Sequence, residues 1–204
     1  DAFRRGLDIH AATAAKIYDI SIEDVDADMR RKAKTANFGI IYGISTFGLA
    51  ERLNIPRTEA KTLIEGYFES YPEVKNYMDN VIQQARVNGY VETIFGRKRY
   101  LSDINSQNSI VRGYAERNAI NAPIQGSAAD IIKIAMVNIQ NRIDRENLKT
   151  QMIMQVHDEL NFSVPKEELE YVHKMVTEEM EQAASLKVQL VVDCGVGSNW
   201  LEAH

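Results

Sequence analysis

The sequence has little that would cross-link the chain or place it in a membrane. Cys194 is its single cysteine, so no internal disulfide can form, which is typical of a reducing compartment. No apolar run approaches the roughly 20 residues that would span a bilayer, and no signal-peptide pattern opens the chain. We therefore expect a cytoplasmic protein that does not enter a membrane. We also expect a monomer.

An initiator methionine is also missing, because the chain opens with Asp1-Ala2-Phe3. We expect that it begins inside a longer protein. Its 204 residues, of which 45% are hydrophobic and 26% charged, have an ordinary globular composition. A chain of this length can bury one or two cores without help from disulfides or metals.

The formal net charge of -5 argues against a nucleic-acid binder, but the charges are unevenly distributed. Residues 30–61 contain seven Lys and Arg against two acids, whereas residues 158–181 contain eight acids against two lysines. This distribution suits phosphate in the first half and a metal or solvent in the second. Two solvated helix faces would give the same pattern.

The hydrophobic periodicity predicts many helices followed by antiparallel strands, which is an α+β fold. Helices are expected over residues 9–18, 28–42, 46–53, 57–71, 72–88, 110–146 and 165–184. Strands are expected over residues 90–95, 98–101, 150–156, 160–164 and 188–194. Pro123 should kink or interrupt the long helix, because proline lacks the amide hydrogen that a helix needs.

Arg30, Lys34, Phe38 and Tyr42 follow one another at steps of four residues. Each step advances a helix by 400°, so the four side chains lie on one slowly winding stripe. Cations suit a polyphosphate, and aromatic rings suit a base stacked beyond it. The alternative is an amphipathic helix whose Phe and Tyr face the core while its basic residues reach solvent.

Arg117, Asn121 and Gln125 have the same spacing. Every base pair presents acceptors in the minor groove, so donors aimed there would sense pair geometry without reading sequence. The alternative is that the two amides satisfy backbone groups around Pro123.

His157-Asp158-Glu159 separates two β-rich runs and predicts a tight hairpin. Adjacent carboxylates on a strand turn suit a hard cation such as Mg²⁺, although aspartate is also common in turns for local reasons. His10 lies near a helix start, where it could contact an anion. Arg97, Lys98 and Arg99 could hold a template phosphate or form a solvated hairpin rim.

Taken together, these motifs resemble those of family A DNA polymerases. Residues 30–43, RRKAKTANFGIIYG, resemble motif B, the mobile fingers helix, and residues 155–160, QVHDEL, resemble motif C, the palm hairpin. Residues 8–14 (DIHAATA), 96–101 (GRKRYL) and 116–130 (ERNAINAPIQGSAAD) also match, in the family's order. The resemblance implies a fingers subdomain with a connecting hairpin over residues 1–112 and the C-terminal part of the palm over residues 113–204.

The resemblance also implies a role for each position. His10, Arg30 and Lys34 would hold the incoming dNTP, Phe38 would face its sugar, and Tyr42 would guard the nascent base pair. Primer–template DNA would be contacted by Arg117, Asn121, Gln125, Arg97, Arg99 and His157. Asp158 would bind Mg²⁺, with Glu159 and Lys34 also taking part in catalysis. In the family, paired Mg²⁺ ions align the primer 3′-hydroxyl for attack on the α-phosphate.

The family's motif A, Asp-Tyr-Ser-Gln-Ile-Glu-Leu-Arg in its usual form, does not occur in the chain. It would lie just upstream of Asp1, and it would supply a carboxylate that bridges both metals. We therefore expect a polymerase fragment that is not catalytically competent alone. A single-subunit RNA polymerase fragment and a non-catalytic DNA-binding module on a polymerase scaffold remain as alternatives.

Overall fold

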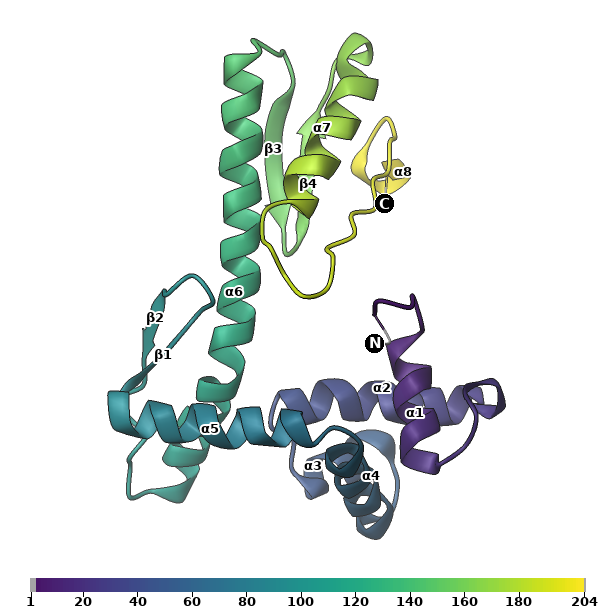
Figure 1. Cartoon of the computed structure of the whole chain (residues 1–204), viewed down its shortest axis with the longest axis vertical. Helices are drawn as coiled ribbons and strands as arrows, with labels where there is room; N and C mark the ends of the chain where they lie inside the picture. The colour runs from purple at the N-terminus through teal and green to yellow at the C-terminus, as the bar shows by residue number, and fades with distance from the viewer. Residues whose placement is uncertain (1–2, 204) are drawn as a thin grey trace. The chain divides into compact units, whose positions relative to one another are not determined.

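The computed structural model describes residues 3–203, so residues 1, 2 and 204, at the outer limits of the two expected subdomains, lie outside it. The chain forms two compact units, one ending at Ile124 and the other beginning at Gln125. The two strand pairs are separate antiparallel sheets among predominantly helical elements, which confirms the α+β class (Figure 1). The division between fingers and palm at residues 112 and 113 stays a prediction.

The first unit contains helices α1 to α5, the hairpin β1–β2 and the first part of α6. Their bounds are α1 Ile9–Tyr18, the 3-10 turn η1 Ile22–Asp24, α2 Ala27–Ile41, α3 Thr46–Leu53, α4 Arg57–Ser70, α5 Pro72–Asn88, β1 Tyr90–Glu92, β2 Lys98–Tyr100 and α6 Ser109–Arg145. The predicted bounds of α1, α3 and α5 are confirmed to the residue. Of the two expectations for Pro123, a kink or an interruption, the interruption is wrong, since α6 continues through it.

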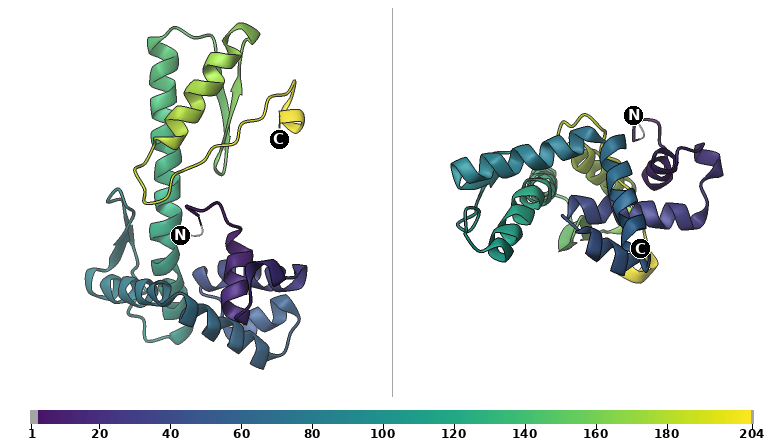
Figure 2. Two further views of the ribbon diagram at one scale, coloured as in Figure 1. Left: turned by 45° about the vertical axis from the view of Figure 1, so that its right-hand side comes forward. Right: turned by 90° about the horizontal axis from the view of Figure 1, so that it is seen from below.

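Helix α1 packs on α2 through small side chains. Thr13 and Ala14 of α1, together with Ala33 and Ala36 of α2, are each exposed by 1% or less. Small side chains allow two helices to approach closely, and Figures 1 and 2 show α1 lying against α2. The remaining core of this group of helices has an aliphatic cluster that includes Leu49 and Leu63, and a second cluster that includes Ile40 and the buried Tyr67.

Helix α2 ends in a complete Schellman motif. The amide of Gly43 donates to the carbonyl of Ile40 at 2.9 Å, and the amide of Ile44 donates to the carbonyl of Gly39 at 2.8 Å. Gly43 has φ +72°, which L side chains adopt only with strain. A Cβ there would also lie 2.8 Å from Cγ of Arg117. The end of α2 is therefore fixed by backbone conformation and by close packing.

The β1–β2 hairpin is shorter than predicted. Tyr90 pairs with Tyr100 and Glu92 with Lys98, after which the ladder stops. The hydroxyl of Thr93 accepts from the amides of Phe95 and Arg97, so the chain turns where the sequence predicted a strand to residue 95. The hairpin rests on Val81, Ala85 and buried residues of the first part of α6.

The second unit comprises the rest of α6 and the segments that follow it. These are β3 Gln151–Val156, β4 Glu159–Ser163, the 3-10 turn η2 Lys166–Glu168, α7 Leu169–Glu181 and α8 Trp200–Ala203. One face of the β3–β4 hairpin places Met152, Leu160 and Phe162 against the core between α6 and α7. The helix predicted over residues 165–184 begins as η2 and continues as α7, which ends at Glu181.

The closing strand predicted over residues 188–194 is wrong, because this segment has no strand structure. Its β-branched residues favour a strand only beside another strand with which they can pair. The amide of Val192 instead donates to the Glu181 carboxylate at 3.2 Å, and Val191 is exposed.

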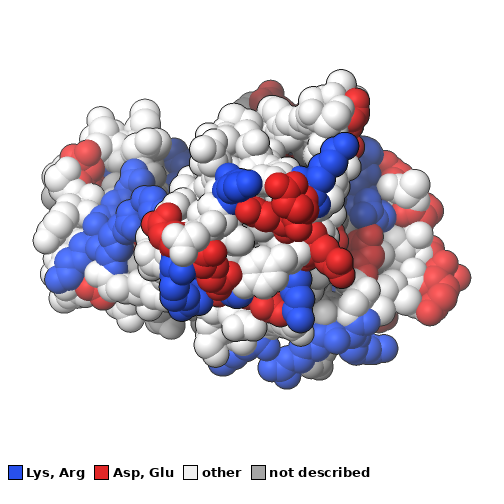
Figure 3. All heavy atoms as spheres, turned by 90° about the horizontal axis from the view of Figure 1, so that it is seen from above, with Lys and Arg blue, Asp and Glu red and all other residues white. Residues whose placement is uncertain are grey.

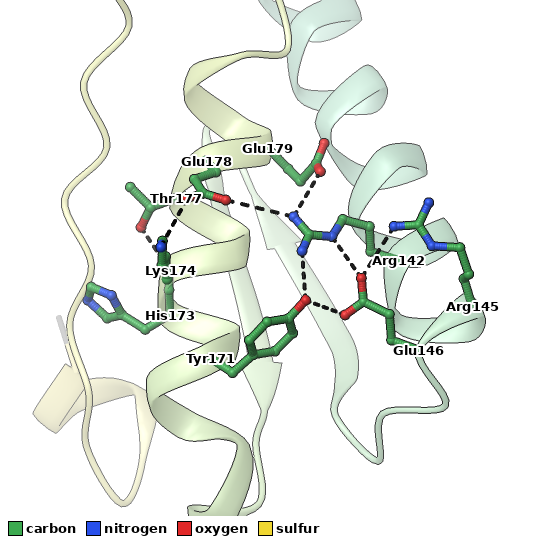
Figure 4. Close-up of polar contacts among 9 residues, drawn as sticks. All are labelled: Arg142, Arg145, Glu146, Tyr171, His173, Lys174, Thr177, Glu178 and Glu179. Atoms are coloured by element: carbon green, nitrogen blue, oxygen red, sulfur yellow. Dashed lines mark hydrogen bonds and ion pairs between the residues drawn. The ribbon is translucent and has the colours of Figure 1, made fainter.

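Arg142 of α6 is the centre of a polar network that joins α6 to α7 (Figure 4). Its guanidinium donates to Glu146 at 3.2 Å, to Glu179 at 3.3 Å and to the Tyr171 hydroxyl at 2.7 Å. Tyr171 in turn donates to Glu146. Burial disfavours the charged guanidinium, but the hydrogen bonds outweigh this effect and raise the pKa of Arg142.

Glu168 joins η2 to the start of β3. Its carboxylate accepts from the amides of Lys149 at 2.8 Å and Thr150 at 3.0 Å, and from the Thr150 hydroxyl at 2.7 Å. The Lys149 amide, followed by the Thr150 hydroxyl, lowers the pKa of Glu168. These bonds therefore depend on the ionised carboxylate.

Gly43→Ala should destabilise the chain by more than about 1–2 kcal/mol, since it adds contact with Arg117 to the cost of the left-handed conformation. Gly89→Ala is the matched control, because Gly89 has φ +76° with nothing within 4 Å of the added Cβ. Urea unfolding followed by circular dichroism measures both. Equal losses would show that packing against Arg117 contributes nothing.

Glu168→Gln should lower the unfolding temperature at pH 7 and have less effect in acid. A carboxylate whose pKa is lowered by folding contributes stability above its unfolded pKa, and this contribution disappears as the pH falls through the folded pKa. Thermal unfolding between pH 7 and pH 3 tests this, with the exposed neighbour substitution Glu167→Gln as control. If the difference in unfolding temperature between Glu168→Gln and the unmodified chain stays constant over this range, the stabilising role of the ionised Glu168 carboxylate is contradicted.

Candidate functional site

The predicted stripe on α2 faces solvent. Arg30 and Lys34 are exposed, and Phe38 and Tyr42 are 51% and 49% exposed. The opposite side of the helix buries Ala33, Ala36 and Ile40. The alternative in which Phe38 and Tyr42 form a core face is therefore wrong, and two large rings remain available beside two cations.

The start of α1 adds His10 to this face. The His10 and Phe38 rings lie 5.6 Å apart between centroids, inclined by 50°. Nδ1 of His10 is 3.0 Å from the side-chain nitrogen of Asn37, which is buried between α1 and α2. Burial is the main cause that lowers the pKa of His10; nearby Arg30 and Lys34 lower it further, whereas Asp8 raises it. Burial and the two cations thus favour the neutral form of His10.

Asp8 has two functions at the start of α1. One carboxylate oxygen accepts from the amides of His10 and Ala11, both at 2.9 Å, and so caps the helix. The other oxygen accepts from Nε of Arg30 at 2.8 Å and from its Nη2 at 2.7 Å. The Ala11 amide and Arg30 lower the pKa of Asp8, so both contacts favour the ionised carboxylate.

Lys34 has no such partner. Its ammonium forms no hydrogen bond or ion pair with any residue from 3 to 203. Its basic neighbours on α2 differ, because Arg31 pairs with Asp28 at 2.6 Å and Lys32 pairs with Glu59 at 2.7 Å. A lone exposed cation beside two rings and a neutral imidazole suits an anionic ligand that carries a flat group.

The predicted DNA contacts Arg117, Asn121 and Gln125 all lie on α6, but they are divided between the two units of the chain. Arg117 is exposed and its stem packs against Gly43, next to Tyr42. Asn121 is half-buried and Gln125 is the first residue of the second unit. Neither amide side chain hydrogen-bonds within the described chain, so the alternative that they satisfy backbone around Pro123 is not supported.

The β1–β2 hairpin presents its basic residues to solvent. Arg97 and Arg99 are exposed, and Arg99 makes a long 3.4 Å bond to the side-chain oxygen of Asn118. Lys98 lies 4.3 Å from the centroid of the Tyr90 ring. This arrangement leaves both predicted meanings open, a phosphate contact and a solvated rim.

The β3–β4 hairpin has the predicted tight turn. Val156 pairs with Glu159, so His157 and Asp158 alone form the tip. His157 is left-handed, with φ +52°, and its carbonyl accepts from the Gln155 side chain at 2.9 Å. Asp158 is exposed and Glu159 half-buried. Within residues 3–203, no three His, Cys, Asp or Glu side chains gather in a group that could hold a metal.

Charges of both signs share the face drawn in Figure 3, where Lys and Arg lie among Asp and Glu. The pairs of Arg142 and those along α2 give the same picture at atomic detail. On this face and in these pairs, charges of opposite sign therefore lie close together, and individual side chains such as Lys34 matter more than the net charge.

Comparison with known proteins identifies the family. The sequence model for DNA polymerase family A matches residues 1–202. The chain belongs to DNA polymerase family A.

Relatives of this family A chain are bacterial. It is 56% identical over 203 residues to DNA polymerase I of Geobacillus stearothermophilus, covering 100% of this chain and 23% of that protein. Identity to DNA polymerase I of Bacillus caldotenax is 54% over 203 residues, with the same coverage. The chain thus spans about a quarter of the length of the curated relatives it matches.

A solved structure matches the fold of this family A chain. It is the POL domain of Pol1 from M. smegmatis in complex with DNA primer-template and dNTP, with a TM-score of 0.93 and 43% identity. The match covers 99% of this chain and 36% of that one. None of the helices within residues 3–203 is long and apolar enough to cross a membrane.

The sequence reasoning missed the residues that support this family A site. Asn37 and Thr13 are buried polar residues between α1 and α2, and the Asp8 carboxylate accepts from Arg30. The detectable signal was Asn37 itself, a polar residue on the alanine-rich side of α2.

Proposed function

We propose that the polymerase to which this chain belongs adds deoxynucleotides to a primer 3′-hydroxyl under the direction of a template. The observation that carries this proposal is the solvent-facing surface formed by His10, Arg30, Lys34 and Phe38. It offers cations, a neutral donor and an aromatic ring, which are the groups that a nucleoside triphosphate requires. Family membership and the dNTP in the matched M. smegmatis complex support this ligand.

Within this surface, Lys34 and Arg30 bind phosphate oxygens and His10 donates a hydrogen bond to them. Lys34 also offsets the charge that develops on the leaving pyrophosphate, which makes it a catalytic residue. Phe38 packs against the deoxyribose. Tyr42, at the C-terminal end of α2, contacts the nascent base pair.

DNA is contacted from α6 and from both hairpins. Arg117, Asn121 and Gln125 donate to the minor-groove acceptors that all base pairs share, which suits an enzyme that must copy any sequence. Arg97 and Arg99 bind template phosphates, and His157 contacts DNA at the hairpin tip. Neither amide group donates a hydrogen bond within the described chain, which supports Asn121 and Gln125 as donors to DNA.

Enzymes of this family generally use Mg²⁺. The donor set fits this ion in part, because Asp158 is an exposed carboxylate and Glu159 lies beside it, whereas Mg²⁺ prefers several oxygen ligands. We propose Asp158 as a ligand and Glu159 in support. When bound, Mg²⁺ would neutralise phosphate charge and activate the primer hydroxyl.

The 204-residue chain is proposed to be inactive alone, since the motif A sequence, which would supply a further metal-binding carboxylate, does not occur in it. The working enzyme is proposed to be a cytoplasmic bacterial monomer, in keeping with its bacterial relatives.

Lys34→Ala should weaken binding of dATP to the chain roughly tenfold or more, because a charge-assisted phosphate contact contributes about 1.5–3 kcal/mol. Isothermal titration calorimetry measures this, with Lys61→Ala as the control, since Lys61 already pairs with Glu65 on α4. Unchanged affinity after Lys34→Ala would favour a DNA-binding module without nucleotide recognition.

A chimera tests the activity. This chain replaces the matching 203 residues of the G. stearothermophilus DNA polymerase I, and primer extension is measured with dNTPs and with rNTPs. We expect extension with dNTPs that Asp158→Ala lowers about a thousandfold, the loss expected when several kcal/mol of metal stabilisation disappear.

The 204-residue chain alone should give no extension in the same assay. Extension by the isolated chain that Asp158→Ala abolishes would contradict its proposed dependence on other segments. Preference of the chimera for rNTPs would favour the RNA polymerase alternative.

A further inference from the structure

Asn37 and Thr13 form a buried hydrogen-bonding chain that ends at His10. The Thr13 hydroxyl lies 2.8 Å from the carbonyl oxygen of Ile9, 3.2 Å from the side-chain nitrogen of Asn37 and 3.2 Å from the Tyr71 hydroxyl. The same Asn37 nitrogen lies 3.0 Å from Nδ1 of His10. Thr13 is 1% exposed and Asn37 9% exposed, so water does not replace these partners readily.

The direction of every bond in this chain follows from the carbonyl at its start. The Ile9 carbonyl can only accept, so the single hydrogen of the Thr13 hydroxyl is directed to it. Thr13 must then accept from Asn37 and from Tyr71, which occupies both of its lone pairs. A flipped Asn37 amide would place an oxygen opposite the Thr13 oxygen, two acceptors without a hydrogen between them.

The amide of Asn37 therefore uses one hydrogen for Thr13 and the other for His10. An amide nitrogen cannot accept, so Nδ1 of His10 must be the acceptor and carry no proton. The proton of the neutral ring then lies on Nε2. Protonation of Nδ1 would bring its N–H against the N–H of Asn37, two donors without an acceptor. The Asn37 bond therefore also disfavours the imidazolium form of His10.

We propose that Asn37 is a positioning residue that fixes His10 in the Nε2–H tautomer, so that His10 presents a neutral hydrogen-bond donor to a phosphate oxygen of the bound nucleotide. The assignment of the ligand rests on the proposed function, whereas the tautomer does not. Positive charge for the triphosphate comes from Arg30 and Lys34, and the Phe38 ring supports the imidazole from the α2 side. Asp8, Arg30 and Lys34 are the charged groups that act on His10.

The tautomer is measured by nitrogen-15 NMR of the 204-residue chain, from two-bond couplings between ring carbon-bound hydrogens and the two ring nitrogens. The chain has four histidines, and loss of one signal set in His10→Gln assigns His10. We expect the Nε2–H pattern in the unmodified chain. An Nδ1–H pattern, or an even mixture, would overturn the proposal without reference to any variant.

Thr13→Val removes the hydroxyl that orients Asn37 while keeping the side-chain shape. The ratio of Nε2–H to Nδ1–H tautomer should fall about fivefold, the effect of losing roughly one buried hydrogen bond. Thr62→Val is the matched control, because the Thr62 hydroxyl makes the same bond to a carbonyl four residues earlier, that of Thr58, at an exposed position of α4. Equal ratios in the two variants would count against the proposal.

Asn37→Asp should have the opposite effect on the protonation of His10, because a carboxylate accepts from Nδ1–H and favours the imidazolium. The pKa of His10 should rise by roughly one pH unit or more. A role for Asn37 in packing alone predicts no such rise. If circular dichroism shows that Asn37→Asp does not fold, the proposal is tested by the His10 tautomer in the unmodified chain and by the tautomer ratio in Thr13→Val.

Titration with dATP, and with deoxyadenosine as the control without phosphates, separates this inference from the proposed function. A shift of the His10 Nε2 signal with dATP alone supports both. An Nε2–H tautomer whose Nε2 signal does not shift with dATP would contradict the nucleotide site but would still support the role of Asn37. Response to dATP in the opposite tautomer overturns only the inference.

Discussion

The close contact between α1 and α2 is the constraint on which the candidate site depends. Alanine and threonine at the buried positions let the two helices approach until Asn37 can reach both Thr13 and His10. A buried amide is costly unless each of its hydrogens has a partner, so the contact is specific as well as close. The surface that faces solvent is consequently assembled from two helices, with His10 from one and the basic and aromatic stripe from the other.

Helix positions were largely predictable because their ends carry local chemistry. Asp8 caps α1, Pro72 starts α5 and Gly89 ends it, and each signal acts within a few residues. Segments that depend on distant partners were not predictable. Residues 188–194 have strand-forming side chains but no paired strand. Helix α6 also continues through Pro123, although a proline there loses a helical hydrogen bond.

The stripe on α2 followed from helical spacing alone, since residues four apart must share a face. Spacing could not decide whether this face pointed inward or outward, and the exposure of Phe38 and Tyr42 decided it. The contribution of Asn37 was beyond sequence reasoning for a different reason. It depends on hydrogen bonds to Thr13 and His10, 24 and 27 residues away in the chain.

The ion pair between Asp8 and Arg30 has a thermodynamic consequence. An arginine side chain loses up to about 2 kcal/mol of rotamer entropy when it is ordered. Asp8 already orders Arg30 through Nε and Nη2, while a guanidinium has five N–H groups in all. An arriving anion can therefore bind the remaining N–H groups of an arm that folding has preorganised, and little of its binding energy is lost to ordering that arm.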